Sequence, residues 1–359
     1  LGEVVIGDID YARRYLNRLQ AVQPDDLQAV AARYLVAAGM SVVGLGPQQQ
    51  PAAAPENAEV MRLEPFELVE LEQGARLLLQ RDTRLPKVHL RCVLRGGPMY
   101  EPHNQRGVSQ LMAELLTKDT AKRSAAEVAS LIESIGGSFV ASGGNNTVSF
   151  ALEVLPTDLE LALDLLGDAL SCPSFTEATF RTELEAQIAN LKEEDDEILD
   201  YGFRKLREHF FGPHPFAVGA DGRVADLEQL RREDVVEHFK RLVTAPNVVL
   251  AVSGDFDPGY VQQRIQALVD SALPAHTLPL ADAPLDAGPA ASGEMVESMD
   301  REQAVVLHAY PDVGIQQEPY VLGEMLNELF SGMSSRLFAR LREDKGLASY
   351  VGSNLIVGL

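Results

Sequence analysis

The sequence predicts an α+β fold built from repeated modules, in which an antiparallel-rich sheet is covered by helices. Two features of the 359-residue chain indicate this fold. Strands occur in hairpins and are followed by runs of amphipathic helices, unlike the strict strand–helix alternation of a doubly wound parallel sheet. A helix, connection and strand near the N-terminus also recur in the second half of the chain, which indicates an internal repeat.

The repeat becomes visible when residues 19–34 are compared with residues 227–242. Identical residues coincide at three places along the two helical stretches, and these are Leu19 with Leu227, Asp26 with Asp234, and Arg33 with Arg241. Each copy then continues through an apolar strand to a glycine, Gly46 in the first and Gly254 in the second. Because the order of elements is shared as well, duplication is a better explanation than chance.

Two segments rich in Pro and Ala divide the chain and are typical of interdomain linkers. We expect five parts: the tail of a preceding module (1–46), a linker (47–60), a complete module (61–276), a second linker (277–294) and the start of a following module (295–359). The chain is therefore expected to be a piece of a longer polypeptide.

Within the complete module, alternating apolar residues on both sides of Glu72-Gln73-Gly74 predict a first hairpin. A second hairpin, 138–154, turns at Gly143–Asn146. Other strands are expected at 87–94 and 247–253. Helices are expected at 106–118, 124–135, 157–170, 176–196, 199–210, 232–243 and 258–271. Residues 24–35 predict a helix before the first linker, and residues 41–45 predict a short strand after that helix. After the second linker, the pattern predicts a strand at 303–309 and helices at 317–330 and 335–343.

The composition argues against several classes of partner. Lys and Arg number 31 against 53 Asp and Glu, giving a net charge of −22 that would repel nucleic acid and anionic lipid. No apolar run approaches the roughly 18 residues that a membrane span requires. The two cysteines, Cys92 and Cys172, lie in no CxxC pattern, which favours two buried thiols over a disulfide or a metal site.

The segment with the most chemical content is residues 107–120. Val108, Leu111, Met112, Leu115 and Leu116 follow the i, i+3, i+4 spacing of a buried helix face. The segment, with Arg95, Gly96, Glu101 and Pro102 before it, resembles the frame of the M16 (pitrilysin, insulinase and processing-peptidase) zinc peptidases. That frame has the form G-x-x-H-x-x-E-H-x-x-x-K-x-T, and Gly107, Lys118 and Thr120 stand in register with it.

The residues that would hold zinc are missing from this frame. In the family, two histidines four residues apart on one helical face bind Zn²⁺, and a glutamate on that face acts on the zinc-bound water. Here the histidine positions hold Gln110 and Glu114, and the glutamate position holds Ala113. The resemblance places the family's third ligand, a glutamate, at Asn190. No two of the seven histidines show i, i+4 spacing on a helix, so we expect no metal site in this chain.

Two other places resemble the family. Gly136 and Gly137 match a segment that opens the strand beside the substrate cleft, where an edge strand can pair with an extended peptide; an ordinary turn explains them equally well. Residues 334–353 resemble the pattern S-S-R-L-F-x-x-x-R-E-x-x-G-L-A-Y, in which Arg and Tyr reach across to substrate in the zinc-bearing half. Arg342 matches that Arg. Tyr350 stands one residue late, so it is either turned to the other face or restored by a bulge.

The resemblance implies a non-catalytic half of an M16 zinc metallopeptidase that helps enclose peptide substrates. It further implies that zinc is bound in a catalytic M16 half, in the same polypeptide or in a partner subunit. The alternative is a scaffold or interaction protein of the same fold without proteolysis. An intact H-x-x-E-H upstream of Leu1, or in a neighbouring reading frame, would favour the first interpretation.

Overall fold

The structure is a computed structural model that describes residues 21–34, 64–275, 293–312, 314, 315, 317 and 319–358. The chain divides into two compact units, Leu1–Arg62 and Leu63–Leu359. Within the first unit, helix α2 (Pro24–Tyr34) agrees with the predicted helix. The predicted strand at 41–45 and both predicted linkers lie largely or wholly outside the described residues. Among the residues described, no helix is both long enough and apolar enough to cross a bilayer.

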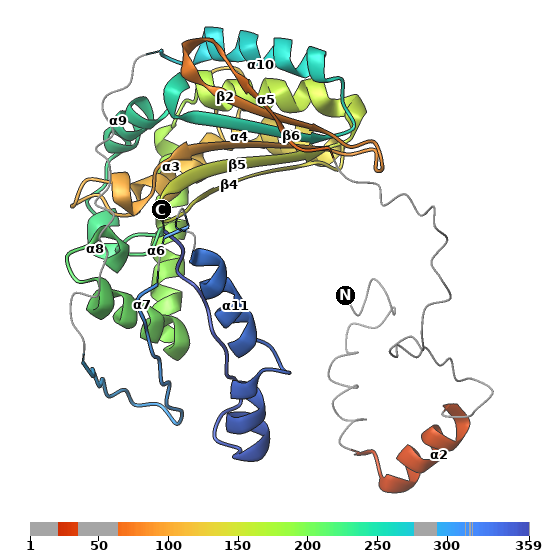
Figure 1. Cartoon of the computed structure of the whole chain (residues 1–359), viewed down its shortest axis with the longest axis vertical. Helices are drawn as coiled ribbons and strands as arrows, with labels where there is room; N and C mark the ends of the chain where they lie inside the picture. The colour runs from red at the N-terminus through yellow and green to blue at the C-terminus, as the bar shows by residue number, and fades with distance from the viewer. Residues whose placement is uncertain are drawn as a thin grey trace. The chain divides into compact units, whose positions relative to one another are not determined.

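The described part of the second unit contains a mixed, six-stranded sheet (Figure 1). Its strands follow the order β1-β2-β6-β3-β5-β4. Its strands are β1 (Glu67–Glu70), β2 (Arg76–Arg81), β3 (Val88–Arg95), β4 (Ser138–Gly143), β5 (Thr147–Val154) and β6 (Val248–Gly254). All neighbouring strands pair antiparallel except β2 and β6, which are parallel. The prediction of an antiparallel-rich sheet is confirmed, and β4 lies at one edge of it.

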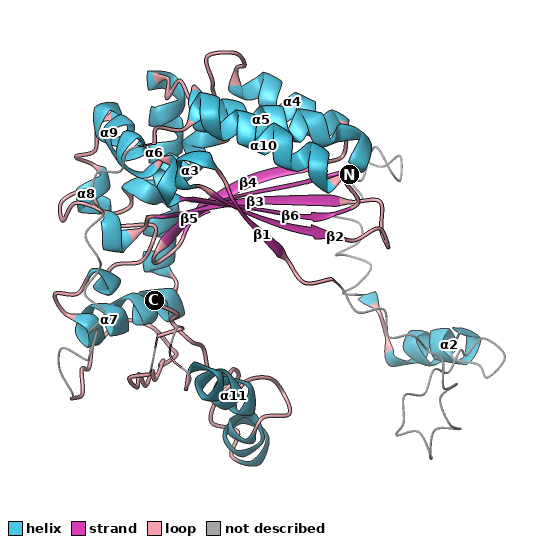
Figure 2. Cartoon of the chain, turned by 45° about the horizontal axis from the view of Figure 1, so that its top comes forward, coloured by secondary structure: helices cyan, strands magenta, loops and turns pink. Residues whose placement is uncertain are grey.

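Helices cover one face of the sheet, as Figure 2 shows for α4, α5 and α10. The helices of the complete module are α3 (Val108–Leu116), α4 (Ala125–Ser134), α5 (Leu159–Ser171), α6 (Glu177–Asp196), α7 (Ile198–Phe211), α8 (Val224–Leu227), α9 (Arg232–Leu242) and α10 (Pro258–Ala272). The strands send alternate side chains into this layer. In β3, Val88, Leu90, Cys92 and Leu94 are buried, whereas the residues between them are exposed or half-buried.

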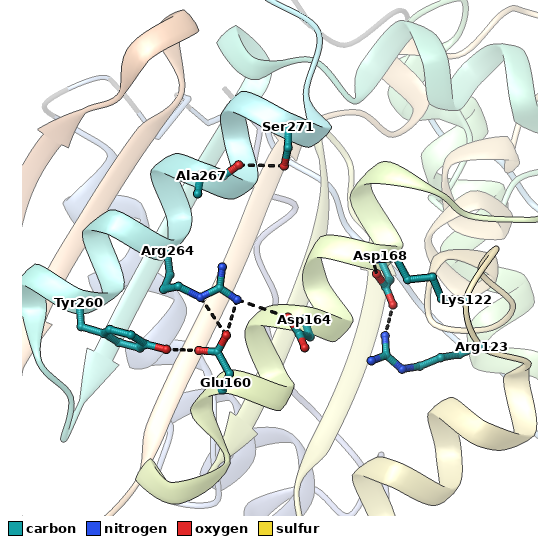
Figure 3. A network of polar contacts seen from close by, with 9 residues as sticks. All are labelled: Lys122, Arg123, Glu160, Asp164, Asp168, Tyr260, Arg264, Ala267 and Ser271. Carbon is teal, nitrogen blue, oxygen red and sulfur yellow. Dashed lines mark hydrogen bonds and ion pairs between the residues drawn. The ribbon is translucent and has the colours of Figure 1, made fainter.

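Polar contacts hold the outer helices together (Figure 3). Arg264 of α10 donates to Glu160 and Asp164 of α5, and Tyr260 donates to Glu160. Farther along α5, the buried carboxylate of Asp168 accepts from Lys122 and Arg123 in the loop before α4. Because Asp168 is buried, its two cationic partners compensate for the loss of water around the carboxylate.

Residues 293–358 differ from expectation in two places. The predicted strand at 303–309 has no strand pairing in the described part of the chain, and a strand without a partner leaves its backbone groups unpaired. The predicted helix 317–330 is confirmed as α11 (Tyr320–Phe330). The predicted helix 335–343 appears chiefly as a π-helix, Phe338–Asp344. The two cysteines are free; Cys92 is buried, as expected, and Cys172 is half-buried.

Candidate functional site

Helix α3 is fixed in place from its first residue. Gly107 precedes it with a φ of +98°, a left-handed conformation that disfavours other residues. A Cβ at Gly107 would also lie 2.6 Å from the carbonyl oxygen of Asp221. The apolar face predicted for α3 is buried, and Gln110 and Glu114 remain half-buried on the adjacent face. The frame of the expected zinc helix is therefore present.

Gln110 and Glu114, which the sequence analysis matched to the two histidine positions, are hydrogen bonded to each other. The Gln110 amide Nε2 donates to Glu114 Oε1 over 3.1 Å. At its other end, Gln110 Oε1 accepts from the backbone N–H of Gly143 over 2.6 Å. Both ends of the amide are thus occupied by protein groups.

The contact with Gly143 lies on the free edge of the sheet. Gly144 N–H donates to Thr147 across the β4–β5 turn, so alternate residues of β4 direct their backbone groups toward β5. Phe139, Ala141 and Gly143 are the residues whose groups point the other way. Gln110 therefore covers the last donor of this edge, and nothing in the described part of the chain pairs with the edge groups of Phe139 and Ala141.

The carboxylate of Glu114 lies in an acidic setting. Burial raises its pKa above the ordinary value, and the charges of Glu183 and Asp221 add to that rise. Lys118 and the Gln110 hydrogen bond act in the opposite direction. Lys118 also forms an ion pair with Glu183 of α6 over 3.2 Å. Glu183, which the sequence reasoning missed, is thus the α6 carboxylate that acts on Glu114.

The residues of this site do not fit a zinc ion. Gln110 offers a neutral amide that is already hydrogen bonded, and Ala113 is fully buried and has no donor atom. Asn190 lies on the exposed side of α6, and no hydrogen bond joins it to Gln110 or Glu114 in the described residues. Over the same residues, no group of three or more His, Cys, Asp or Glu side chains lies close enough to hold a metal ion.

A buried polar chain holds the N-terminal end of α3. Arg241 donates to His238 Nδ1 over 2.8 Å, and the distance from His238 Nε2 to Ser109 Oγ is also 2.8 Å. Since arginine can only donate, the ring proton lies on Nε2, which donates to Ser109. Glu101 accepts from the backbone N–H groups of Gly107 and Ser109. Burial lowers the pKa of His238 to about 3, so the imidazole is neutral at pH 7.

This chain of contacts involves a Ser–His pair, but it does not have the exposure that a nucleophile needs. Ser109 is fully buried, and His238 is 2% exposed. His238 is therefore suited to a structural role. One member of this polar chain was visible in the sequence, because Glu101 belongs, with Pro102, to the segment before α3 that resembles the family frame.

Gly136 and Gly137 have a local structural reason. They end α4 with N–H groups that donate to Glu133 and Ile132, and Gly136 has a φ of +63°. These are the two hydrogen bonds of a Schellman motif. A Cβ at Gly137 would lie 3.0 Å from the carbonyl oxygen of Glu153 in β5. The turn that we weighed against a substrate role is therefore present, and β4 starts directly after it.

Arg342 and Tyr350 are both exposed. The guanidinium of Arg342 lies 4.7 Å from the centre of the Phe338 ring, and its Nε is 4.0 Å from Glu343. Tyr350 is 73% exposed. Neither side chain forms a hydrogen bond with α3 in the described residues, so the structure does not bring these two positions together with Gln110 and Glu114.

Comparisons with known proteins agree on one family. Residues 76–215 match the family described as "Insulinase (Peptidase family M16)", and residues 229–357 match "Peptidase M16 inactive domain". An uncharacterized zinc protease of Rickettsia felis is 24% identical, over 81% of this chain and 70% of its own. Subunit 1 of the bovine mitochondrial cytochrome b-c1 complex is 24% identical, over 52% of this chain and 39% of its own. The peptidase M16 inactive domain from Pseudomonas fluorescens has the same fold, with a TM-score of 0.71 and 20% identity over 82% of this chain and 71% of that one.

Proposed function

The chain belongs to peptidase family M16, and on that premise we propose that it is a non-catalytic half of a zinc metallopeptidase. In this proposal it helps enclose and position peptide substrates. Zinc is held by a catalytic M16 half, in the same polypeptide or in a partner subunit. The observation that carries the proposal is the hydrogen bond between Gln110 and Glu114. In the proposed match these two residues stand where the family has its zinc histidines, and their side chains do not fit the metal.

The free edge of β4 supports a role in holding peptides. An extended peptide adds to a sheet by pairing its backbone with unpaired groups at the edge. Phe139 and Ala141 direct such groups outward, whereas the donor of Gly143 is already taken by Gln110. A bound peptide would therefore pair with the first part of β4 and stop short of α3.

The exposed Arg342 supports a contribution to a site outside this half. Its guanidinium forms no hydrogen bond in the described residues and lies near only one acid, Glu343, at 4.0 Å. In this proposal Arg342 reaches the substrate carbonyl in the zinc-bearing half. Tyr350, one residue beyond the family position, is proposed to lie beside the same substrate.

The test compares this chain alone with the chain combined with a zinc-bearing M16 half. The 359-residue chain, prepared without chelators, is expected to contain no stoichiometric zinc and to cleave no peptide. The chain combined with a zinc-bearing M16 half, fused to it or mixed with it, is expected to cleave peptides. About one zinc per chain, lost on Glu114→Ala, would contradict the proposal.

A second candidate function is a scaffold subunit without proteolysis. The similarity to a protein named as a subunit of the cytochrome b-c1 complex favours it, since that name assigns the protein to an assembly rather than to proteolysis. The two candidates differ in one result. A scaffold would leave the complete protein or assembly without peptidase activity, and it would leave hydrogen exchange at Phe139 and Ala141 unchanged when peptides are added.

A further inference from the structure

The sheet face opposite the helices is the part of the complete module that the proposed function leaves without a chemical role. It is lined by the residues that alternate with the buried ones in each strand. In β5 and β6 these residues are small or uncharged apart from Glu153, and in β4 they are Ser138, Val140 and Ser142. On this face, called the open face below, the residues of β5 and β6 are half-buried and those of β4 are exposed.

Cations gather on this open face although the chain is strongly acidic. Arg76 projects from β2, and Arg91 and Arg95 project from β3; all three are exposed. Lys87 lies just before β3 on the same face and binds Glu153, which is also 3.3 Å from His89. Glu70 stands directly opposite Arg76 on β1. Hence the two acids of the face lie beside Arg76, Lys87 and His89, and neither pairs with Arg91 or Arg95.

Arg91 lies near the middle of β3, between strands β5 and β6. Its direct neighbours across the sheet are Ala151 of β5 and Ala251 of β6, so no large side chain stands beside it. No hydrogen bond or ion pair involves the Arg91 side chain in the described residues. An unpaired guanidinium on this face keeps its positive charge free to attract a carboxylate through space, without direct contact between the two groups.

We propose that the open face, through Arg91 and Arg95, makes this half select acidic peptides. The inference rests on the proposed function, because it takes the peptide to be paired with the edge of β4. Strands lie about 4.8 Å apart, so a peptide beside β4 runs about 14 Å from β3. Its acidic side chains on the open face would extend toward the arginines. This distance exceeds the Debye length of about 8 Å at physiological ionic strength, so the preference is expected to weaken as salt rises.

The test uses the 359-residue chain and three extended peptides of one length, in which the same positions carry Glu, Gln or Lys. The Glu peptide is expected to bind about tenfold more tightly than the Gln peptide at low salt, and the Lys peptide more weakly than both. Arg91→Glu is expected to abolish this ranking of the three peptide affinities. Arg181→Glu is the matched control, because Arg181 lies exposed on α6, pairs with Glu177 and is expected to leave the order unchanged.

A second variant separates this inference from the proposed function. Ala141→Pro removes an outward N–H of β4 and leaves the bonds to β5 in place, so it should weaken all three peptides equally. If the three peptides bind equally and Ala141→Pro weakens them, the acidic preference is wrong and the proposed function stands. If no peptide binds the chain, both proposals fail.

Discussion

At the scale of single residues, the side chain of Gln110 joins helix α3 to the free edge of the sheet. Its amide accepts from Gly143 and donates to Glu114, so one residue uses both of its polar ends between two elements. A histidine at this position would direct its ring nitrogen to a metal. The glutamine instead makes a contact that needs no metal, which gives α3 and β4 a fixed relation in this half.

Gln110→Ala is expected to lower the free energy of unfolding by about 1 kcal/mol, because two half-buried hydrogen bonds are lost and water replaces them only in part. The pKa of Glu114 should also rise further, since the Gln110 hydrogen bond lowers it. Urea unfolding measures the first effect. Gln229→Ala, at an exposed position, is the control and should change stability little. Equal stability of Gln110→Ala and wild type would show that the contact contributes nothing.

His238 makes the stability of the protein depend on pH. Its pKa is lowered from 6.5 to about 3, chiefly by burial and then by the charge of Arg241. The unfolded chain therefore binds more protons between these two values, and stability falls as pH drops below about 6.5. The loss is on the order of 1 kcal/mol per pH unit from this one group.

His238→Gln is expected to remove this part of the pH dependence. Urea unfolding of both proteins between pH 5 and 8 should give curves that converge toward low pH, with wild type the more stable at pH 8. His103→Gln, at an exposed position, should follow wild type. Parallel curves for wild type and His238→Gln would mean that the imidazole does not titrate as its burial indicates.

At the scale of elements, the sequence predicts most of the complete module. Alternation with period two marks the strands of both hairpins, and apolar spacing marks α3, because these patterns follow from which face is buried. The parallel pairing of β2 with β6 has no such signal, since it depends on which distant strands meet. Residues 303–309 show the opposite case: an apolar run has the pattern of a strand but no partner in the described residues.

The site was predictable to the same degree. The apolar face of α3 and the absence of a histidine pair from it can be recognised in the sequence alone, because both depend on spacing within one helix. The role of Glu183 does not, since its effect on Glu114 depends on how α6 crosses α3. Counting residues from one helix to the other led to Asn190, which is exposed. The position of the third ligand stays a prediction, and the packing of α3 against α6 gives it a direct test.

The pair Gln110→His and Glu114→His is expected to bind zinc weakly, with Glu183 as the third ligand and water as the fourth. Ala113 is left unchanged, because it is fully buried and a glutamate there would be strained. Adding Glu183→Gln should lower the zinc affinity about tenfold or more. Adding Asn190→Glu to the same pair should change the zinc affinity less than adding Glu183→Gln does. The opposite ranking, measured by competition with a chelator, would assign the third position to residue 190.

At the scale of the whole molecule, no hydrogen bond or ion pair in the described residues joins helix α3 to the segment 338–350. α3 is tied to the sheet by Gln110 and to α9 by the Ser109–His238 contact, so it is suited to a structural role. The π-helix Phe338–Asp344 presents Arg342 to solvent, and π-helical turns are frequent at functional sites. If this half contributes to catalysis, its contribution is expected from Arg342 rather than from α3.

Arg342→Ala is therefore expected to lower kcat of the complete enzyme about tenfold or more, since a cation directed at a developing oxyanion stabilises the transition state specifically. Stability should change little, because the side chain is exposed and, among the described residues, lies near Phe338 and Glu343 without a hydrogen bond. Arg340→Ala is the matched control, since it removes an equal charge from the same exposed helix. Peptide cleavage and thermal unfolding are measured on both variants. If Arg342→Ala and Arg340→Ala reduce kcat equally, only the charge of the segment matters, and Arg342 has no directed role.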